Sequence, residues 1–538
     1  MTVSNENRAP SGNVPPSPSP RLPIGLPLID GGLVEPLRPG RMIDSIDPST
    51  GHRIAQFHAC STEDVDRAVQ AAQCCFESRE WRQMRPLDRG RLLERLALLV
   101  EEHRDELAAL ESLDSGKLLG VTRAIDLQFT IDGLRHYAGW ASKVAGEYVN
   151  HSPLVPEDAV YRAYTQRRPL GVVAGITPWN FPIGQAIQKI APAIAFGCTV
   201  VLKPAQETSL TALRLGELIL EAMFPAGAVN IITGHGAEIG GALVDHPLVR
   251  KIAFTGSTTT GQNILMASAK TMKRVTLELG GKSPTIILAD ADLDRAIPGA
   301  AAAIFANSGQ ICTAGSRLLI EAPVYDKVME GVCEIARTLR LGSAFDPATQ
   351  MGPLVSARHR DRVDALVTTG LREGAVALAG GTAGDGNGWF YRPTVLGNVS
   401  SRMRVMREEI FGPVVCATRI DDAADIVRMA NDTPFGLAAS IWTRNLDRAH
   451  LLAERIDAGT VWLNTHNVLD LAMPFGGLKL SGLGHEFGNE AMKSFTEPKA
   501  VCMRLDPGAL SDRVEGRLAV PRHRTDGSVY DGGSCDVV

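Results

Sequence analysis

Residues 171–203 read GVVAGITPWNFPIGQAIQKIAPAIAFGCTVVLK and contain two short apolar runs separated by a longer helical pattern. The runs at 171–176 and 198–203 are rich in β-branched residues and are bounded by Gly or Pro, which is typical of strands. Residues 182–196 lie between them and place apolar side chains at helical spacing. Because neighbouring parallel strands need a crossover connection, this stretch predicts a right-handed βαβ unit.

The same alternation continues along the chain. It predicts an α/β fold with a doubly wound parallel sheet, whose ligands bind at the carboxyl ends of the strands. A second alternation begins near residue 291 and predicts another α/β unit, while 62–76 and 88–113 read as amphipathic helices. The other expected strands are 229–233, 251–255, 284–288, 316–320, 375–378 and 392–396, and the other expected helices are 209–223, 238–244, 258–267 and 325–340.

Composition limits the classes of function. The chain has 538 residues, 55 Lys and Arg against 60 Asp and Glu, and 44% hydrophobic residues, so it can bury large cores in about three domains. Its near-neutral charge argues against nucleic acid as a partner. The longest apolar stretch, 298–306, is far shorter than the roughly 20 residues that span a bilayer. Residues 1–7 lack the features of a secretory signal, so we expect no membrane partner and a cytoplasmic location.

The cysteines show no pattern of a disulfide framework or of a zinc site. Their number is odd, and no CxxC spacing or nearby His pair accompanies them, so we expect reduced thiols and no metal. The nine are Cys60, Cys74, Cys75, Cys198, Cys312, Cys333, Cys416, Cys502 and Cys535.

One cysteine occupies a reactive-looking position. Residues 305–317 read FANSGQICTAGSR and place Cys312 on an expected turn between a helix and a strand. Flanking glycines let a ligand or another backbone come close, which suits a nucleophile. A small buried hydrophobe is the alternative, and the segment alone leaves both open.

A carboxylate stands before a glycine pair in residues 277–284, LELGGKSP. Burial of Glu278 between two leucines would raise its pKa towards neutrality, as a general base requires. An outward-facing strand glutamate explains the same pattern, so the segment alone does not decide.

Two further segments join an expected strand to an expected helix. In 176–182, ITPWNFP, the Asn180 amide could donate to a developing oxyanion, or it could be a helix N-cap followed by a first-turn proline. In 254–261, FTGSTTTG, free backbone N–H groups could bind a pyrophosphate. The latter is neither a GxGxxG fingerprint nor a P-loop, so its phosphate role also stays open.

Taken in order, these segments resemble the aldehyde dehydrogenase superfamily, in its NAD(P)-dependent, non-acylating branch. The resemblance extends from about residue 40 to about residue 503. It also includes Lys203-Pro204, EEIFGP at 408–413, NDTPFGL at 431–437 and PFGGLKLSGLG at 474–484.

The resemblance implies a catalytic role for three residues. Cys312 would attack the aldehyde carbon as a thiolate, while the Asn180 side chain and the Cys312 backbone N–H stabilise the oxyanion of the thiohemiacetal. Hydride transfer to the nicotinamide would leave a thioester on Cys312, and Glu278 would activate the water that hydrolyses it. Family branches that pass the acyl group to coenzyme A usually lack this glutamate, so Glu278 favours hydrolysis.

The resemblance also implies an NAD site. Lys203 would reach the adenosine ribose, Ser257 the pyrophosphate and Glu409 the nicotinamide ribose. Many NAD-preferring members have Glu where this chain has Gln206, which weakens discrimination against NADP; we still expect NAD. The cofactor-binding residues expected are Ile176, Thr177, Pro178, Trp179, Lys203, Gln206, Gly256, Ser257, Gly261, Leu279, Glu409 and Phe411.

The expected substrate pocket is polar. Gln185 and Gln188 occupy sites where family members often have bulky apolar residues, which favours a small or hydroxylated aldehyde unless these side chains face water. The expected pocket residues are Phe181, Gln185, Gln188, Ile311, Thr313, His466, Leu469 and Phe475.

Domain limits follow by analogy with the family. We expect a flexible leader at 1–36, a dinucleotide-binding domain at 37–148 and 169–282, and a catalytic domain at 283–482. An oligomerisation arm at 149–168 and 483–505 would add a strand to a neighbouring subunit, giving a homodimer or homotetramer, and 506–538 would be a C-terminal extension. The competing hypotheses are a coenzyme A-acylating semialdehyde dehydrogenase and a catalytically silent binding or structural homologue.

Overall fold

The computed structural model describes residues 20–150 and 160–505. They divide into two compact units, of which the first comprises the chain up to Val144 together with Arg168–Glu497. The second comprises Ala145–Arg167 and the residues from Pro498 onward. Within the described ranges, no helix has both the length and the apolar character needed to cross a membrane.

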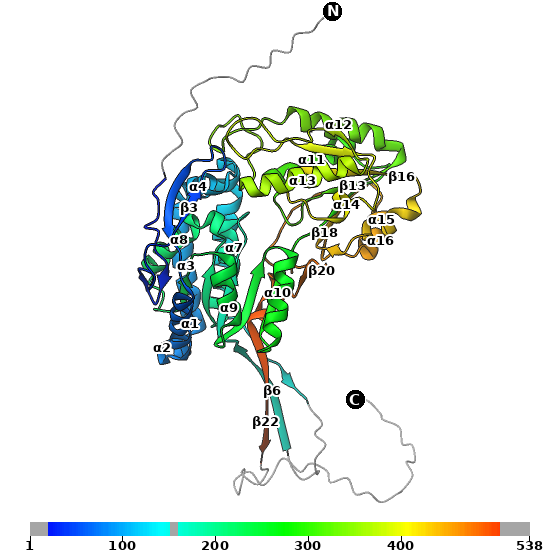
Figure 1. Ribbon diagram of the computed structural model, residues 1–538. Helices are drawn as coiled ribbons and strands as arrows, with labels where there is room; N and C mark the ends of the chain where they lie inside the picture. Colours follow the sequence, from blue (N-terminus) through cyan, green and yellow to red (C-terminus); the bar gives the residue numbers. More distant parts are fainter. Residues whose placement is uncertain (1–19, 151–159, 506–538) are drawn as a thin grey trace, which may run out of the picture. The chain divides into compact units, whose positions relative to one another are not determined.

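The first unit contains an eight-stranded sheet (Figure 1). Its order is β2-β1-β9-β8-β7-β10-β11-β21, and the five central strands are parallel. The predicted βαβ unit is confirmed, because β7 and β8 pair in parallel on either side of α7. The strands are β1 Leu28–Ile29, β2 Gly32–Leu33, β7 Val172–Ile176, β8 Thr199–Lys203, β9 Val229–Ile231, β10 Val249–Thr255, β11 Arg274–Glu278 and β21 Gly482–Leu483.

Both faces of this sheet are covered by helices, as the apolar strand sequences predict. Val173 and Val200 point into a core shared with α3, α6, α7 and α8, whereas Val172 and Val201 point into a core shared with α1, α9 and α10. The helices are α1 Thr62–Glu77, α2 Arg79–Gln83, α3 Pro86–Glu102, α4 Arg104–Ser115, α5 Leu119–Val121, α6 Leu127–Trp140, α7 Pro182–Ala195, α8 Leu210–Glu221, α9 Gly241–Asp245 and α10 Thr258–Ala269.

Two helical predictions need correction. The helix expected at 88–113 is two helices, α3 and α4, which meet at His103. The one expected at 238–244 begins as a π-helical turn, Gly236–Gly240, and continues as α9. A second π-helical turn, Thr122–Asp126, links α5 to α6.

The leader predicted over 1–36 is wrong for its second half. β1 and β2 form a hairpin, and β1 pairs with β9 at the edge of the sheet. Leu28 and Ile29 are each only 1% exposed, and burial of each contributes about 2 kcal/mol. The turn uses Asp30 and Gly31 with positive φ, a hairpin signal that the Pro-rich composition obscured. Residues 1–19 lie outside the described ranges.

A seven-stranded sheet makes up the rest of the first unit's α/β structure. Its order is β14-β15-β16-β13-β12-β18-β19, parallel except at β14. The chain leaves the first sheet after β11, enters the second at β12, and returns to the first at β21. The second α/β unit that we predicted is thus present. The strands are β12 Pro284–Ile287, β13 Arg317–Glu321, β14 Val376–Ala379, β15 Thr394–Gly397, β16 Val414–Ile420, β18 Ala438–Trp442 and β19 Thr460–Leu463.

Helices also pack on this second sheet. α11 and α12 share one core with it, while α13 and α14 share another. Short ladders complete the unit, namely β3 Met42–Ile46 with β4 Arg53–His58, and β17 Phe435–Gly436 with β20 Leu478–Lys479. The helices are α11 Leu293–Phe305, α12 Tyr325–Thr338, α13 Ala357–Arg372, α14 Arg404–Arg407, α15 Ile426–Asn431 and α16 Leu446–Arg455. The last helix, α17 Gly488–Phe495, packs in the core of the first sheet instead.

The second unit is a three-stranded sheet of order β22-β6-β5. β5 Tyr148–Val149 pairs antiparallel with β6 Val160–Pro169, and β22 is Thr496–Leu505. The predicted arm began too early at its second segment, because α17 packs in the core of the first unit. Residues 151–159 and the extension at 506–538 lie outside the described ranges, and the arm's part in an oligomer stays a prediction.

Candidate active site

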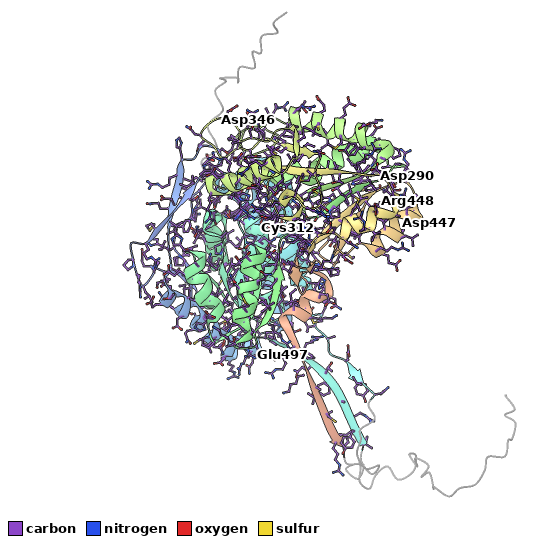
Figure 2. The ribbon with its side chains drawn as sticks, turned by 45° about the vertical axis from the view of Figure 1, so that its right-hand side comes forward. Asp290, Cys312, Asp346, Asp447, Arg448 and Glu497 are labelled. Atoms are coloured by element: carbon purple, nitrogen blue, oxygen red, sulfur yellow. The ribbon has the colours of Figure 1, made fainter. Side chains whose placement is uncertain are left out.

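Cys312 lies between the two sheets, on the connection from α11 to β13 (Figure 2). Asn307 and Ser308 have positive φ there, and Gly309 has a φ of +72°. A Cβ on Gly309 would lie 2.0 Å from the Gly412 carbonyl oxygen, so only glycine fits at this crossing. The turn directs Cys312 into a cavity of about 310 Å³ that also contains Glu278 and Asn180.

The Cys312 thiol is held in its protonated form. Burial raises its pKa to about 12, and the nearby carboxyls of Glu409 and Glu278 add to the shift. A thiolate is the nucleophilic form, so attack requires a base that takes the proton. The expected helix–turn–strand setting of the cysteine is confirmed, and the sulfur faces a cavity rather than a closed core.

Glu278 is the last residue of β11 and is only 4% exposed, so the outward-facing interpretation is wrong. Neither carboxyl oxygen has a hydrogen-bond partner among the described residues. Burial and the neighbouring Glu486 raise its pKa well above the usual range, while Lys189 opposes the shift. A carboxylate whose pKa is raised accepts a proton more readily than an ordinary glutamate does.

A buried ionic group stands beside Glu278. Lys189, on α7, forms an ion pair with Glu486 and donates to Thr255 Oγ1 at 2.8 Å. Glu486 lies just before α17, some 300 residues from Lys189 in the chain. The pattern of the sequence had not singled out either residue, because an isolated Lys or Glu carries no local signal of burial.

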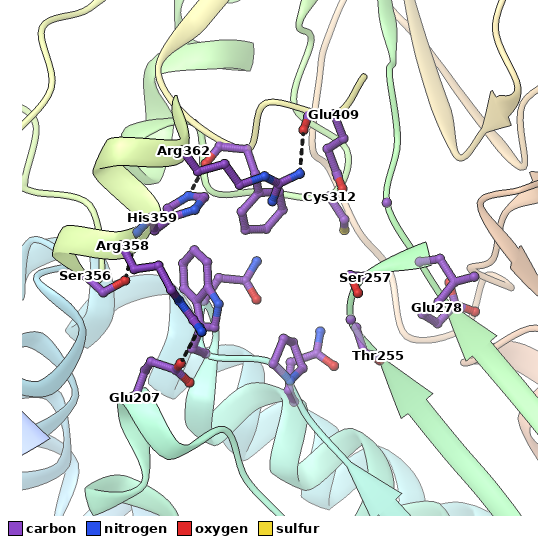
Figure 3. Close-up of a pocket in the computed structure, with 18 residues that line it drawn as sticks. Glu207, Thr255, Ser257, Glu278, Cys312, Ser356, Arg358, His359, Arg362 and Glu409 are labelled. Carbon is purple, nitrogen blue, oxygen red and sulfur yellow. Dashed lines mark hydrogen bonds and ion pairs between the residues drawn. The ribbon is translucent and has the colours of Figure 1, made fainter. Parts of the chain in front are cut away.

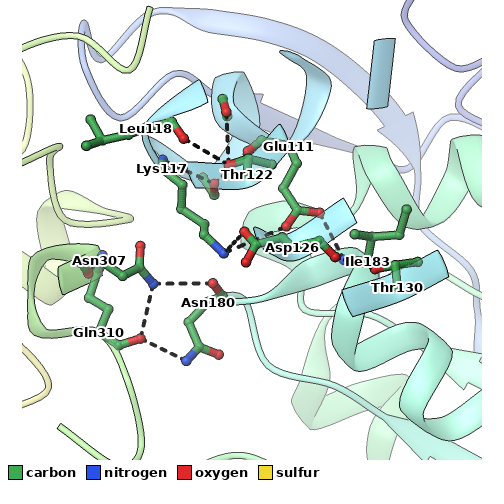
Figure 4. A network of polar contacts seen from close by, with 12 residues as sticks. Glu111, Lys117, Leu118, Thr122, Asp126, Thr130, Asn180, Ile183, Asn307 and Gln310 are labelled. Carbon is green, nitrogen blue, oxygen red and sulfur yellow. Dashed lines mark hydrogen bonds and ion pairs between the residues drawn. The ribbon is translucent and has the colours of Figure 1, made fainter. Parts of the chain in front are cut away.

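Asn180 points into the same cavity from the end of the β7–α7 connection. Its Nδ2 donates to the Gln310 carbonyl at 2.8 Å, and Asn307 Nδ2 in turn contacts the Asn180 carbonyl at 3.4 Å (Figure 4). The Oδ1 atom has no hydrogen-bond partner in the part of the chain that the structure describes. The N-cap of α7 is Phe181, so the capping interpretation of Asn180 is wrong, although Pro182 does occupy the first turn.

A second polar group fixes the start of α7. Glu111 Oε2 accepts the Ile183 backbone N–H at 3.0 Å, and Lys117 forms ion pairs with Glu111 and Asp126 (Figure 4). Lys117 Nζ also lies 3.9 Å from the centre of the Phe181 ring. These contacts hold the segment that carries Asn180, because a carboxylate at a helix N-terminus satisfies its free N–H groups.

A larger cleft of about 940 Å³ lies at the carboxyl ends of β7, β8 and β10. Lys203 is buried in it and donates to the Pro204 carbonyl at 2.8 Å, while burial lowers its pKa to about 8. Gln206 also lines the cleft and bonds to His235 at 2.9 Å. The expected cofactor residues found here are Ile176, Thr177, Pro178, Trp179, Lys203, Gln206, Gly256 and Ser257.

The remaining expected cofactor residues border the smaller cavity, with one exception. Glu409 Oε1 accepts the Gly281 N–H at 3.1 Å, and burial raises the pKa of Glu409 to about 7. Phe411 packs edge-to-face on Trp179, with ring centres 5.3 Å apart, and Leu279 lines the wall. Gly261 does not reach either cavity; a Cβ there would lie 2.5 Å from a Leu279 methyl, so it is a packing position.

Five residues that the sequence had not singled out also line the smaller cavity (Figure 3). Four come from the first turns of α13 or its N-cap, and one follows β8. His359 Nε2 donates to the Phe411 carbonyl at 2.7 Å, and burial lowers its pKa to about 4, so it is neutral. Charged and polar residues on helices usually face solvent, so no local signal in the sequence marked these five residues. They are Glu207, Ser356, Arg358, His359 and Arg362.

Of the expected substrate residues, the structure brings only Gln185 into the cavity with Cys312. Its Oε1 has no hydrogen-bond partner among the residues described. Two others form a neighbouring network, in which His466 contacts the Thr313 carbonyl at 3.1 Å and Thr313 bonds to Asn467. The expected residues that line neither the cavity nor the cleft are Phe181, Gln188, Ile311, Thr313, His466, Leu469 and Phe475.

In the described parts of the chain, no group of three or more His, Cys, Asp or Glu side chains could hold a metal ion.

Comparisons with known proteins agree on one family. The model of the Aldehyde dehydrogenase family matches residues 36–501. Phenylacetaldehyde dehydrogenase of Pseudomonas fluorescens is 46% identical over 463 residues, which cover 86% of this chain and 92% of that protein. Human retinaldehyde dehydrogenase 3 is 44% identical over 468 residues, 87% of this chain and 90% of that protein. The NAD+ complex of a Bacillus cereus aldehyde dehydrogenase has a TM-score of 0.87 at 42% identity, with 89% of this chain and 96% of that chain covered.

Proposed function

Because the chain belongs to the aldehyde dehydrogenase family, we propose that it oxidises an aldehyde to the carboxylic acid with NAD+, through a thioester on Cys312. One observation supports this proposal most strongly. A thiol, a carboxyl with a raised pKa and a side-chain amide come from three distant segments and line one cavity. That cavity shares part of its wall with the cleft at the carboxyl ends of the parallel strands.

The residues present fit a dinucleotide. The cleft offers the buried Lys203 amine and the N-terminus of α10, whose N-cap is Ser257, and the cavity offers the Glu409 carboxylate for ribose hydroxyl groups. We propose that these residues hold the cofactor, with Trp179 and Phe411 packed beside it. When bound, NAD+ would accept a hydride from the substrate carbon.

The chain's own groups account for the other steps. Cys312 gives its proton to solvent water in the cavity, and the thiolate attacks the aldehyde carbon as the carbonyl π bond breaks. The Cys312 backbone N–H and the Asn180 amide stabilise the resulting oxyanion. Asn180 Nδ2 carries two N–H bonds, and only one is needed for its bond to Gln310, so the second can serve the oxyanion. After oxidation the acyl group remains on Cys312 as a thioester. Glu278 then takes a proton from water, whose oxygen attacks the thioester carbon. The C–S bond breaks, the acid is released and Cys312 is left as a thiolate.

The neutral side chain of Gln206 discriminates only weakly between NAD+ and NADP+. We propose a preference for NAD+. A neutral amide neither repels a 2′-phosphate, as a carboxylate does, nor attracts it. A side-by-side measurement of kcat/KM with each cofactor tests this, and a higher value with NADP+ would contradict it.

We propose a small or hydroxylated aldehyde as substrate. The support is the amide of Gln185, which brings an unpartnered polar atom to the cavity that holds Cys312. A screen of small, hydroxylated, amino, aromatic and long-chain aldehydes, followed by absorbance of the reduced cofactor, tests it. Faster turnover of long-chain or aromatic aldehydes would reject this class while leaving the chemistry intact.

The main test of the reaction is an assay without coenzyme A. We expect equal amounts of acid and NADH from the purified chain, because Glu278 supplies hydrolysis. A product that forms only when coenzyme A is added would support the acylating alternative, and no reduced cofactor with any aldehyde would support a catalytically silent homologue.

The assembly and the location are also proposals. The three-stranded sheet of the second unit exposes Tyr148 and Val149, which supports pairing between copies into a homodimer or homotetramer. Light scattering on the purified chain measures the mass, and a monomer would contradict this. A cytoplasmic location rests on the sequence alone, and fractionation of expressing cells tests it.

A further inference from the structure

Arg358 stands where the cavity of Cys312 and the larger cleft meet. It lies in the first turn of α13, beyond the N-cap Ser356, and it lines both spaces. Its Nη2 contacts Glu207 Oε1 at 3.3 Å across the groove (Figure 3). The Arg358 side chain is nevertheless 86% exposed, so solvent surrounds most of it.

The opposite wall at this junction is a helix N-terminus. Ser257 caps α10 and accepts the Thr260 N–H, and Ser257 lines both spaces as Arg358 does. The first N–H groups of a helix carry partial positive charge and favour anions. The junction therefore combines a guanidinium, a helix N-terminus and one opposing carboxylate, Glu207.

The other cations of the two spaces are engaged elsewhere in the described structure. Arg362 donates to the Glu409 carbonyl at 3.2 Å, and Lys203 to the Pro204 carbonyl at 2.8 Å. His359 donates to the Phe411 carbonyl, and His235 bonds to Gln206. Among these cationic side chains, only Arg358 pairs with a partly exposed carboxylate at the junction, that of Glu207.

A dinucleotide that reaches from Lys203 to Glu409 must cross this junction with its two central phosphates. These phosphates carry two negative charges, which the Glu207 carboxylate repels and the Arg358 guanidinium attracts. An exposed ion pair contributes little to stability, whereas an arginine bound to phosphate through two N–H bonds is among the stronger polar contacts. The exchange of one partner for the other is therefore favourable.

We propose that Arg358 leaves Glu207 and binds the pyrophosphate of the cofactor, so that this ion pair sets cofactor affinity. The inference rests on the proposed function, because it requires that NAD+ occupy the groove. It adds a residue of α13 to the proposed cofactor site, and it makes Glu207 a competitor for that residue.

Calorimetric titration of the full chain with ADP, adenosine and NAD+ tests the proposal without an activity assay. We expect Arg358→Gln to raise the Kd of ADP and NAD+ about tenfold, the loss typical of a charge-assisted contact, and to leave adenosine unchanged. Arg360→Gln is the matched control: Arg360 lies on the same helix, pairs with Asp361 and lines neither space, so its Kd values should equal those of the wild type. Thermal melts show that each variant is folded.

Glu207→Gln distinguishes two models. In partner exchange, Arg358 leaves Glu207 for the pyrophosphate; in a clamp, the Arg358–Glu207 ion pair stays intact and holds the two walls of the groove together. Partner exchange predicts about threefold tighter ADP binding, because Arg358 is freed and a repelling charge is removed. A clamp predicts weaker binding, equal to that of Arg358→Gln, and this outcome would overturn the proposal. Unchanged ADP affinity in Arg358→Gln would overturn it as well.

Titration with 2′,5′-ADP, which lacks a pyrophosphate, completes the test. A larger loss for this probe than for ADP would place Arg358 at the 2′-phosphate and reject the assignment. If the wild-type chain binds none of the nucleotides, the proposed function itself fails, whereas binding that ignores Arg358 rejects only this inference.

Discussion

Glu278 and Glu207 line the same cavity but differ in how their charges are held. Glu278 is buried, has no described hydrogen-bond partner and has a raised pKa, so its protonation state is sensitive to its neighbours. Glu207 faces an exposed arginine, so its charge is screened by water. In the proposed reaction, the buried region around Glu278 would control proton transfer and the exposed region around Glu207 would control cofactor binding, because electrostatic interactions weaken as solvent enters.

Cys312→Ala should have the largest effect, since it removes the nucleophile from the buried region. We expect steady-state NADH formation to fall by at least about 1,000-fold, because no covalent intermediate can form. NAD+ affinity measured by titration should stay within about twofold of the wild type, since the binding contacts remain. Substantial residual turnover would show that the sulfur is not the nucleophile.

Glu278→Gln should rank second and should separate oxidation from hydrolysis. We expect one equivalent of NADH in a burst, followed by a steady state slowed about 100-fold or more, because the thioester forms but its hydrolysis lacks a base. Stopped-flow absorbance measures the burst, and mass spectrometry of the quenched protein measures the acyl group on Cys312. Loss of the burst together with the steady state would mean that Glu278 acts before hydride transfer.

Glu486→Gln should shift the pH dependence of hydrolysis. Hydrolysis needs the Glu278 carboxylate, so its rate falls as the pH falls through the pKa of Glu278. The negative charge of Glu486 raises that pKa, and its removal also frees Lys189, so the acidic limb should move down by about one pH unit.

Lys189→Met is the matched opposite of that change. Lys189 lowers the pKa of Glu278, so the acidic limb should move up instead. Single-turnover release of the acyl group from pH 5 to 9 measures both shifts. Shifts of the same sign in the two variants would show that they act through packing rather than through charge.

Gln206→Glu should have the smallest effect, since it changes the exposed region. The new carboxylate would repel a 2′-phosphate and accept a ribose hydroxyl. We expect kcat/KM with NADP+ to fall about tenfold and that with NAD+ to change by less than about twofold. Gln206→Asn keeps the amide and is the control, and an equal loss with both cofactors would mean that residue 206 only supports the fold.

The strands and helices between residues 171 and 267 could largely be predicted from the sequence, because their signals are local. The strands β11, β16, β18 and β19 were not among those expected. The 171–203 segment folds as predicted since its runs of β-branched residues and its helical spacing need only neighbouring residues to be recognised. The hairpin at 28–33 was missed for the opposite reason. Its few apolar residues become a strand only because β9 offers an open edge in the sheet.

The candidate catalytic residues could be named from the order of motifs, but their protonation states could not. The positions of Cys312, Glu278 and Asn180 follow from the resemblance, whereas the raised pKa of Glu278 depends on Glu486, which lies about 200 residues away. Most of the expected substrate residues do not line the cavity, for a similar reason. Whether His466 or Phe475 faces the cavity depends on the packing of one long loop, which no local pattern encodes.

The sequence by itself determined the alternation of strands and helices, the doubly wound architecture and the three candidate catalytic side chains. Only the tertiary structure decided which charges are buried and which pairs can exchange. Arg358 and Glu207 are 151 residues apart in the chain, and no pattern in either segment links them. Burial and charge pairing are sums over neighbours in space, so they exist only once the chain has folded.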